Sequence, residues 1–345
     1  MAELLPLWTA FNFKEMMMLN RKEAIALMNS YGQAQRPFFF MIDYKQKENI
    51  VLPLDEIDPR EIQFEMLNHS VKKKQKKALT FPLSISNDGY SKSNYTVQFE
   101  QVVSAIRKGN SYLVNLTCQT PVTLNVGLEE VFQGTVAKYK LWYKDQFVVF
   151  SPETFVRIEQ GIISSYPMKG TIDATVPDAA ENILNNPKEK AEHSTIVDLI
   201  RNDLSMVADN VQVVRFRYID ELTTDKGKLL QVSSEISGRL PESFPASIGS
   251  ILYTLLPAGS ITGAPKDKTL EIIEQAETYE RGFYTGVFGV FDGLNLDSGV
   301  MIRFIEKNAR GLVYKSGGGI TAFSNLEDEY NEMLKKIYVP FTRKH

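Results

Sequence analysis

Apolar and polar residues follow two different patterns along this chain, and the change between them comes near residue 84. In the first part, residues 21–31 carry apolar side chains at helical spacing, and residues 37–43 form a short apolar run typical of a buried strand. A lysine-rich run at residues 71–77 follows, then turn formers from Pro82, which indicates a solvated linker or helix end. We therefore divide the chain into a short N-terminal α/β portion, residues 1–84, and a larger domain, residues 85–345.

The larger part contains many strand-like runs with helices between them. Residues 93–108 have helical spacing and stop at Gly109 and Asn110, a typical C-terminal signal. Strands are predicted at residues 112–117, 146–151, 154–159, 162–166, 211–218, 286–292, 300–306 and 312–315, and helices at residues 187–202, 244–256, 266–275 and 327–339. Since strands dominate without a regular alternation of strand and helix, the pattern predicts an α+β fold with large antiparallel sheets.

Composition and charge narrow the class of protein. At 345 residues, with 43% hydrophobic and 23% charged residues, the chain resembles an ordinary globular protein with a substantial core. A net charge of −3 gives no reason to expect nucleic acid or an anionic membrane as a partner, and a single cysteine, Cys118, excludes an intramolecular disulfide. Residues 1–13 lack the features of a signal peptide, and we find no apolar stretch of the roughly 20 residues that span a bilayer. We expect a soluble, cytoplasmic protein.

The run YPMKGT, residues 166–171, places a lysine where it could take part in chemistry. Lys169 lies between an apolar residue and a Gly-Thr turn, so burial would lower its pKa and leave a partly neutral, nucleophilic amine. Glu153 lies sixteen residues earlier, just before a predicted strand, and two neighbouring strands could bring both side chains to one face. Such a pair can divide acid and base roles. The alternative is an ordinary surface pair of Glu and Lys.

The predicted helix at residues 187–202 carries a carboxylate on its apolar face. Glu192 falls one turn before Ile196, and a carboxylate on a core-facing stripe is costly unless it meets a cation. We interpret the neighbouring His193 as a packing or surface residue and not as a metal ligand.

A second acidic group opens the last predicted helix. Glu329 and Glu332 are three residues apart and share a face, and Lys336 follows Glu332 by one turn. These carboxylates could simply complement the helix dipole. Alternatively, together with Glu192 they would suit a hard cation such as Mg²⁺.

Two glycine-rich loops, residues 257–266 and 317–320, could expose backbone N–H groups to an anion. The first is not a phosphate-binding P-loop, because Ala264 and Pro265 precede its lysine. The alternative for both loops is a tight turn between strands.

The motifs taken together resemble a known family. In order they read SPETF, YPMKGT, AEHSTIVDLIRND, PAGSITGAPK, RGFYTGVFG and GGGITAFSNLEDEYNE, and they extend from about Tyr95 to Tyr338. This set resembles the chorismate-utilising enzymes, which include anthranilate synthases, aminodeoxychorismate synthases, and isochorismate and salicylate synthases. The resemblance implies two large antiparallel sheets packed face to face with helices outside, and makes residues 85–345 the chorismate-binding catalytic domain.

Two positions favour one branch of the family. Aminodeoxychorismate synthases carry lysine at the position of Lys169, where other branches usually carry alanine. Isochorismate and salicylate synthases use a lysine at the position of Leu113 to activate water, which leucine cannot do. The chain thus resembles component I of aminodeoxychorismate synthase. Gln231 stands where many relatives have histidine, and we give it no acid–base role.

The resemblance implies a mechanism and a set of site residues. Neutral Lys169 would attack C2 of chorismate, Glu153 would protonate the departing C4 hydroxyl, and ammonia would then add at C4. Mg²⁺ would be held by Glu192, Glu329 and Glu332. The implied substrate-binding residues are Arg303, Tyr284, Gly318, Gly319, Thr171, Thr262 and Lys336.

The ammonia would come from a partner. Cys118 has no glutaminase signature around it, so a separate glutamine amidotransferase subunit is expected, with a separate aminodeoxychorismate lyase later releasing 4-aminobenzoate for folate synthesis. Anthranilate synthase and isochorismate synthase activities remain alternatives, as does a non-catalytic chorismate-binding paralogue.

Overall fold

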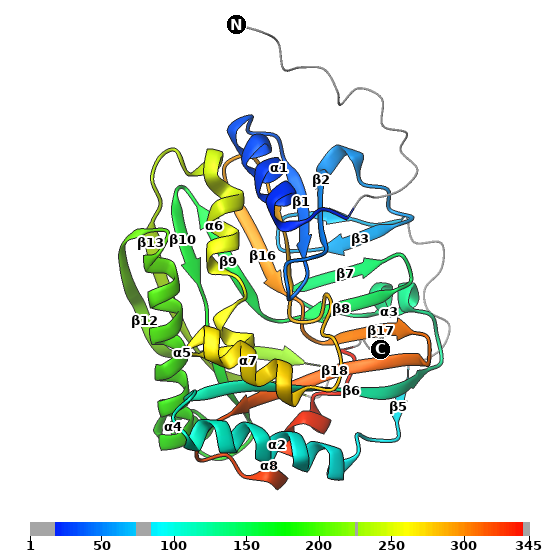
Figure 1. Cartoon of the computed structure of the whole chain (residues 1–345), viewed down its shortest axis with the longest axis vertical. Helices are drawn as coiled ribbons and strands as arrows, with labels where there is room; N and C mark the ends of the chain where they lie inside the picture. The colour runs from blue at the N-terminus through cyan, green and yellow to red at the C-terminus, as the bar shows by residue number, and fades with distance from the viewer. Residues whose placement is uncertain (1–17, 74–83, 225–226, 341–345) are drawn as a thin grey trace, which may run out of the picture.

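The computed structural model describes residues 18–73, 84–224 and 227–340. In these ranges the strands form two nine-stranded antiparallel sheets, which pack against each other with helices on their outer faces (Figure 1). The predicted α+β fold with two large antiparallel sheets is confirmed. Residues 1–13 and most of the lysine-rich run at 71–77 lie outside the described residues, so the predictions made for them remain predictions.

The first sheet, sheet A, has the order β11-β13-β10-β9-β16-β15-β1-β2, and β12 also pairs with β13. Its strands are β1 Phe38–Ile42, β2 Asn49–Pro53, β9 Thr154–Glu159, β10 Ile162–Ser165, β11 Met168–Asp173, β12 Asp209–Thr224, β13 Gly227–Arg239, β15 Val287–Phe291 and β16 Leu296–Val300.

The second sheet, sheet B, has the order β14-β6-β18-β17-β8-β7-β3-β4, with β5 paired to β6. Its strands are β3 Ile62–Glu65, β4 Ser70–Val71, β5 Ile85–Asn87, β6 Leu113–Leu124, β7 Tyr139–Tyr143, β8 Phe147–Ser151, β14 Gly263–Ala264, β17 Phe304–Asn308 and β18 Gly311–Ile320. The N-terminal strands are therefore shared, β1 and β2 by sheet A and β3 and β4 by sheet B. The division of the chain at residue 84 remains a prediction.

The helices cover the outer faces of the two sheets. Helices α1, α5 and α6 bury apolar residues against sheet A, and α2, α3, α7 and α8 do so against sheet B. Their bounds are α1 Arg21–Gln33, α2 Lys92–Arg107, α3 Leu128–Gly134, α4 Ala179–Asn185, α5 Pro187–Ser205, α6 Ile248–Leu255, α7 Lys266–Ala276 and α8 Leu326–Lys335. Short 3₁₀ turns span Leu54–Glu56, Phe244–Ser247 and Gly259–Ile261.

Strand β1 shows why a continuous apolar run was needed. Phe38 and Phe40 point to the core between sheet A and its helices, whereas Phe39 and Met41 point to the core between the two sheets. Since side chains alternate along a strand, a strand buried on both faces must be apolar at every position. Burial of each phenylalanine contributes about 1.5–3 kcal/mol.

The single strand predicted at residues 300–306 is wrong. Strand β16 ends at Val300 in sheet A, and β17 begins at Phe304 in sheet B. The chain crosses between the sheets at residues 301–303, where Arg303 has a φ of 55°. Val300, Met301, Phe304 and Ile305 are buried on either side of the crossing, so the apolar pattern continues through it and did not reveal the break. The crossing places Arg303 beside the interface of the sheets.

The helix predicted at residues 244–256 is divided. A 3₁₀ turn precedes α6, and another 3₁₀ turn lies at Gly259–Ile261. The stretch Phe244–Ile261 is long and apolar enough to cross a membrane, with a mean hydropathy of 1.3, but 56% of it is buried inside the protein. Core helices of globular proteins can be equally long and apolar, so this stretch is weak evidence of a membrane span.

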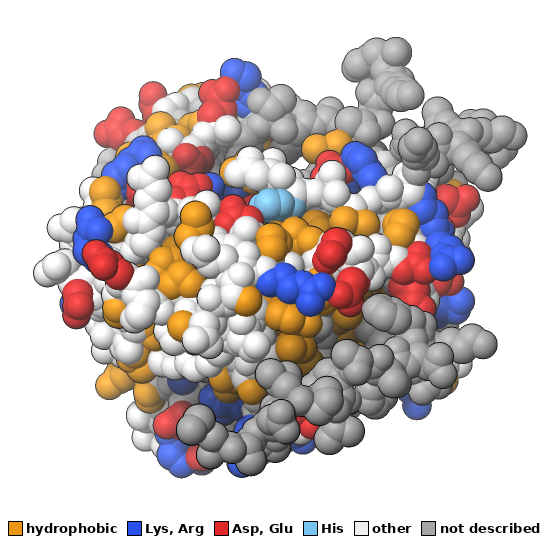
Figure 2. All heavy atoms as spheres, turned by 90° about the horizontal axis from the view of Figure 1, so that it is seen from above, with side chains coloured by type: hydrophobic (Ala, Val, Ile, Leu, Met, Phe, Trp, Pro, Cys, Tyr) orange, Lys and Arg blue, Asp and Glu red, His pale blue; other side chains and the backbone are white. Residues whose placement is uncertain are grey.

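Figure 2 shows one face of the molecule, on which acidic and basic side chains are interspersed around a central group of hydrophobic ones.

Candidate active site

Lys169 lies in β11, where the strand is irregular. The pairing of β11 with β13 shifts between Met168 and Thr171, and Gly170 has a φ of 78°, a conformation that glycine adopts without steric cost. Irregularities of this kind redirect a side chain away from the regular pleat. Lys169 Nζ donates a hydrogen bond of 3.2 Å to Glu192 Oε2, and 26% of the lysine side chain is exposed.

The charge state of Lys169 differs from the sequence prediction. Burial acts to lower the pKa of this lysine, but the carboxylates of Glu192, Glu332 and Glu189 act in the opposite direction, and the pKa lies above its ordinary value. Lys169 is therefore an ammonium ion in this structure, and the prediction of a partly neutral amine is wrong. The sequence indicated burial of the lysine, but the carboxylates around it come from two helices that only the fold brings near.

Glu192 reaches Lys169 from helix α5. Asn186 caps the first turn of this helix, and Ile196 buries its side chain in the core on sheet A. Glu192 lies on the same face, and its side chain is only 9% exposed. The prediction of a carboxylate on the core-facing stripe is confirmed, and Lys169 provides the cation that such a position requires.

Gly319 in β18 lies against the lysine. A Cβ atom added at Gly319 would lie 3.2 Å from Lys169 Nζ and 2.9 Å from Leu113 Cδ1, so a side chain there would displace one or both of them. Leu113 is 4% exposed and borders the lysine from β6. The strand backbone thus approaches the ammonium group directly, as the glycine-rich sequence of this strand allows.

Gly318, the preceding residue, faces helix α8. The position of a Cβ atom at Gly318 would be 3.6 Å from Glu329 Oε2, 3.8 Å from Glu332 Oε1 and 3.7 Å from Lys336 Nζ. Lys336 Nζ also donates to Gly317 O at 2.8 Å and pairs with Glu332 Oε1 at 2.8 Å. Two carboxylates and one ammonium group therefore converge on the space that a side chain of residue 318 would occupy.

Helix α8 presents these groups through its regular spacing. Asn325 caps its N-terminus, and Ser324 Oγ donates a hydrogen bond of 2.7 Å to Glu329 Oε1. Glu329 is 5% exposed, and the side chain of Glu332 is 57% exposed. Burial lowers the pKa of Lys336 below its ordinary value, although Glu332 acts to raise it. The predicted shared face of these residues is confirmed.

Glu153 lies in the turn between β8 and β9, and Ser260 Oγ donates a hydrogen bond to Glu153 Oε1. Burial raises the pKa of Glu153 above its ordinary value, while this hydrogen bond and the positive charges of Arg303, Lys169 and Lys336 oppose the change. The carboxyl group therefore keeps its proton to a higher pH than an exposed glutamate does. The charges that act on it come from the same groups that line the space around Lys169.

Arg303 and Tyr284 lie near these groups, since the charge of Arg303 acts on the pKa of Glu153, of Lys336 and of Tyr284. The Arg303 guanidinium lies 5.3 Å from the centre of the Tyr338 ring, and its buried Nε has no hydrogen-bond partner among the described residues. Tyr284 is 3% exposed and packs against Phe304 with 5.8 Å between ring centres. The guanidinium can therefore receive a carboxylate.

The two threonines with predicted substrate contacts are placed differently. Thr171 is exposed, and its Oγ1 accepts a hydrogen bond of 3.5 Å from Gln231 Nε2. Thr262 is fully buried, and its hydroxyl donates to Ala258 O at 3.0 Å, within its own loop. Contacts of either residue with a substrate remain predictions.

Three residues near the reactive groups were not identified from the sequence. They are Ser260, which bonds Glu153, Glu189, which raises the pKa of Lys169, and Leu113, which was considered only as a branch marker. The available signal for Ser260 was a hydroxyl residue within a glycine-rich loop, which we interpreted through its backbone alone.

The acidic residues fit Mg²⁺ in part. Glu329 and Glu332 point to one space over Gly318, and Mg²⁺ commonly takes one or two carboxylates and keeps several waters. Glu192 is paired with Lys169 instead, and within the described ranges no group of three or more His, Cys, Asp or Glu residues could hold a metal ion. A magnesium site remains a prediction.

One small cavity lies beside these groups. A cavity of about 30 Å³ is lined by Glu153, Ser260 and Asp203, among others. A larger cavity of about 820 Å³ lies over strands β9, β10, β12 and β13 and includes none of the predicted site residues. Lys169 lines neither of these two cavities, and its ammonium group is paired with Glu192.

These features define a class of protein. A lysine against a glycine-rich strand, a carboxyl group with a raised pKa and an arginine whose Nε has no hydrogen-bond partner among the described residues lie near the junction of the two sheets. This is the arrangement of an enzyme that acts on a small molecule carrying carboxylate groups.

The chain belongs to the chorismate binding enzyme family, whose family model matches residues 12–342. It is 52% identical to the uncharacterized PabA-like protein of Haemophilus influenzae, over 90% of this chain and 94% of that protein. It is 31% identical to aminodeoxychorismate synthase component 1 of Bacillus subtilis, over 77% of this chain but only 57% of that protein. The fold matches the menaquinone-specific isochorismate synthase of Escherichia coli with a TM-score of 0.70 at 16% identity, covering 92% of this chain and 81% of that one. The resemblance to chorismate-utilising enzymes is confirmed.

Proposed function

We propose that this protein aminates chorismate at C4, forming 4-amino-4-deoxychorismate, as aminodeoxychorismate synthase component I does. The observation that carries the proposal is Lys169, a lysine held by Glu192 against the backbone of Gly319 with Glu153 acting in the same space. The similarity to the Bacillus subtilis enzyme of that name supports it.

The first step would use Lys169 as nucleophile and Glu153 as acid. The neutral amine forms a bond to C2, the two ring double bonds shift, and the bond between C4 and its hydroxyl oxygen breaks. Glu153 gives its proton to that oxygen, which leaves as water. Hydroxide is a poor leaving group, so a carboxyl group with a raised pKa suits this role.

The second step would reverse the shift of electrons. Ammonia forms a bond to C4, the double bonds move back, and the electrons of the bond between C2 and nitrogen return to Lys169 as a neutral amine. The carboxylate of Glu153 then takes a proton from the new ammonium group. This returns Glu153 to its protonated state for the next turnover.

Lys169 must lose one proton to solvent before its first attack, since the second step then returns it as a neutral amine. Glu192 holds the ammonium form, since it accepts the hydrogen bond from Nζ and raises the pKa of the lysine. Attack therefore requires the charge of Glu192 to be offset. If Glu192, Glu329 and Glu332 hold Mg²⁺, the bound ion would supply this positive charge and would also neutralise a substrate carboxylate.

The two substrate carboxylates would be bound by the remaining cationic groups. Arg303 offers a planar pair of donors for one of them. Lys336 and the backbone N–H group of Gly319 would bind the other, after Lys336 exchanges Glu332 for the substrate. The N–H group of Gly318 faces β6, with which β18 pairs, so it is left out of the proposal. Tyr284, between Phe304 and this space, would limit the orientation of the ring.

Ammonia would be delivered from outside this chain. Cys118 is the only cysteine in the sequence, it is buried, and its Sγ donates to Gln98 Oε1 at 3.7 Å. Burial raises the pKa of this thiol, so it is a poor thiolate nucleophile for glutamine hydrolysis. We therefore include a separate glutamine amidotransferase subunit in the proposal, and a separate lyase that releases pyruvate to form 4-aminobenzoate.

The test is product identification by mass spectrometry. Purified protein is incubated with chorismate, Mg²⁺ and ammonium at mildly alkaline pH, beside the Lys169→Ala variant. The proposal expects 4-amino-4-deoxychorismate with its enolpyruvyl group retained, and a loss of at least about 100-fold in the variant.

Other products would reject the proposal. Anthranilate that forms equally well in Lys169→Ala would assign the chain to the anthranilate synthase branch, and isochorismate would assign it to the hydrating branch. Chorismate binding without any product would favour a non-catalytic paralogue.

A further inference from the structure

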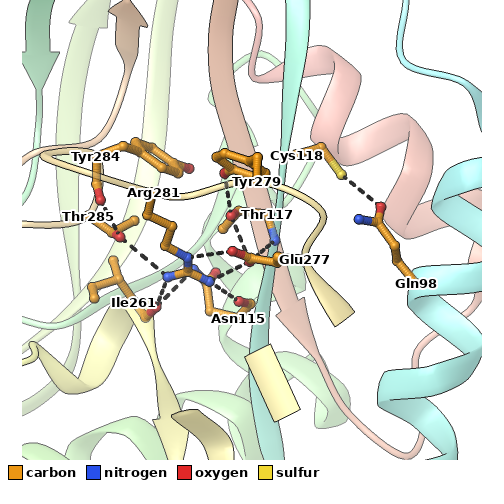
Figure 3. A network of polar contacts seen from close by, with 10 residues as sticks. All are labelled: Gln98, Asn115, Thr117, Cys118, Ile261, Glu277, Tyr279, Arg281, Tyr284 and Thr285. Carbon is orange, nitrogen blue, oxygen red and sulfur yellow. Dashed lines mark hydrogen bonds and ion pairs between the residues drawn. The ribbon is translucent and has the colours of Figure 1, made fainter. Parts of the chain in front are cut away.

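A buried network of polar side chains joins three segments next to the site (Figure 3). These are strand β6, the loop that contains the 3₁₀ turn Gly259–Ile261, and the segment at residues 277–285 that follows α7. Arg281 stands at the centre of the network and is 2% exposed. It has no part in the mechanism proposed above.

All the donors of Arg281 are used within the protein. Its five N–H groups donate to both carboxylate oxygens of Glu277 and to Asn115 O, Ile261 O and Thr285 Oγ1, at 2.6–3.3 Å. A saturated guanidinium cannot also bind a substrate carboxylate. Arg281 therefore differs from Arg303, whose Nε has no hydrogen-bond partner among the described residues.

The pair of Glu277 and Arg281 is anchored to sheet B. Glu277 Oε1 accepts from both the backbone N of Thr117 at 2.9 Å and its Oγ1 at 2.7 Å. Thr117 Oγ1 also shares a hydrogen bond of 2.7 Å with the hydroxyl of Tyr279. With both members satisfied by further hydrogen bonds, the buried pair can fix a geometry and not merely balance charge.

The loop held by this pair carries the partner of the catalytic acid. The carbonyl of Ile261 accepts from Arg281 Nη1 at 2.9 Å and from Asn115 Nδ2 at 3.0 Å. Ser260 is the residue before Ile261, and its hydroxyl donates to Glu153. A hydroxyl can make a directed hydrogen bond only if the backbone that carries it is fixed to within a few tenths of an ångström.

We propose that Arg281 is a positioning residue, which holds the carbonyl of Ile261 so that Ser260 donates to Glu153 and sets when this carboxyl group releases its proton. The inference rests on the proposed function in that Glu153 is taken as the acid of the reaction. Arg281 acts through the loop and touches neither substrate nor Glu153.

The test replaces Arg281 with lysine. Arg281→Lys keeps a positive charge beside Glu277 but has no planar fork, so it cannot bond Glu277, Asn115 and Ile261 together. The control is Arg217→Lys, because Arg217 likewise donates to two backbone carbonyls, those of Leu184 at 2.7 Å and Ile183 at 3.2 Å, outside this network.

The readout is the titration of the Glu153 carboxyl group by infrared difference spectroscopy, without turnover. Its band is identified by its loss in Glu153→Gln. Loss of one hydrogen bond to a carboxylate is expected to raise the pKa of Glu153 by about one unit in Arg281→Lys. Arg217→Lys is expected to leave it unchanged.

A double variant tests whether the effect passes through Ser260. Ser260→Ala should raise the pKa of Glu153 as Arg281→Lys does, and the combination should raise it no further than Ser260→Ala alone. If Arg281→Lys does not fold, Asn115→Ala, which removes the other side-chain donor to Ile261 O, is expected to shift the titration in the same direction. An unchanged titration in folded Arg281→Lys, or in Asn115→Ala in its place, would overturn the inference.

The same variants separate the inference from the proposed function. A shifted Glu153 titration together with no 4-amino-4-deoxychorismate would reject amination and leave the positioning role in place. Amination with an unshifted titration would reject the positioning role alone. When both hold, the alkaline limb of the kcat/KM profile moves to higher pH in Arg281→Lys by the same amount as the infrared band.

Discussion

Replacing Glu192 with glutamine is expected to lower the pKa of Lys169. Burial already acts to lower this pKa, and Glu192 is the strongest of the carboxylates that oppose it. The amide of glutamine can accept the same hydrogen bond from Nζ but carries no charge. Glu192→Gln therefore removes the electrostatic attraction and leaves the burial unchanged.

The size of the effect follows from the distance. Two unit charges 3.2 Å apart, as Lys169 Nζ and Glu192 Oε2 are, attract by about 1 kcal/mol with water-like screening and by about 5 kcal/mol at an effective dielectric constant of 20. Since about 1.4 kcal/mol corresponds to one pKa unit, the fall is expected to be at least about one unit.

The assay is competitive labelling of lysine amines with acetic anhydride across a pH series. The peptide that contains Lys169 is quantified by mass spectrometry, and because 26% of the side chain is exposed, the reagent can reach it. Only the neutral amine reacts, so the labelling curve reports the pKa of Lys169 directly. The measurement needs no turnover, so a loss of metal binding in the variant does not obscure it.

Glu332→Gln is the matched control. Glu332 also raises the pKa of Lys169, but its effect is smaller than that of Glu192, so a smaller fall is expected. The reasoning would be refuted by a labelling curve for Lys169 that is the same in wild type and Glu192→Gln, or by a larger fall in Glu332→Gln.

Three further changes have defined outcomes. Gly318→Ala would place a methyl group at ordinary contact distances of 3.6 Å or more, so we expect about unchanged stability but weaker Mg²⁺ binding, measured by calorimetry. Gly319→Ala would place its methyl group 2.9 Å from a carbon of Leu113 and should instead lose about 1–3 kcal/mol of stability. Equal Mg²⁺ binding by Gly318→Ala and wild type would contradict the magnesium site. Because the pKa of Glu153 is raised in the folded protein, its contribution to stability is present below the ordinary value of 4.5 and is lost as pH rises through the folded value. Glu153→Gln should therefore melt at a higher temperature than wild type near pH 8 but not near pH 4, and the opposite order would be inconsistent with a raised pKa. Burial lowers the pKa of His193 from 6.5 to about 4. The free energy of unfolding of the wild type, measured in urea, should therefore fall by up to about 3 kcal/mol as the pH falls from 6.5 to 4. His193→Gln should not show this loss.

Much of the fold could be predicted because burial leaves a pattern in the sequence. Strand β1 is apolar at every position since both of its faces are buried, and α5 and α7 were identified from apolar residues at helical spacing. Strand β7, by contrast, was missed. Its Lys140 is 4% exposed, and its charge is balanced by Glu65 at 3.7 Å and by the ring of Phe132 at 4.8 Å. These partners are distant in sequence, so the lysine looks like an exposed residue until the chain is folded.

In the candidate site, too, the residues could be identified from local sequence, whereas their interactions could not. Lys169, Glu153, Glu192 and the glycines of β18 were identified from motifs, because each motif occupies one short segment. The charge of Lys169 could not be predicted, since it depends on carboxylates that α5 and α8 bring to β11. The hydrogen bond of Ser260 to Glu153 was also hidden, because these residues are 107 positions apart.

By itself, the sequence determined the α+β class, the family and most of the residues that surround the reactive groups, because periodicity and motifs are local properties of the chain. The tertiary structure decided which charges meet. It placed Arg303 at the crossing between the sheets, made Lys169 an ammonium ion and saturated Arg281. The physical reason is that a pKa or a hydrogen bond depends on distances of a few ångströms, and only the packing of the two sheets sets those distances between segments far apart in the chain.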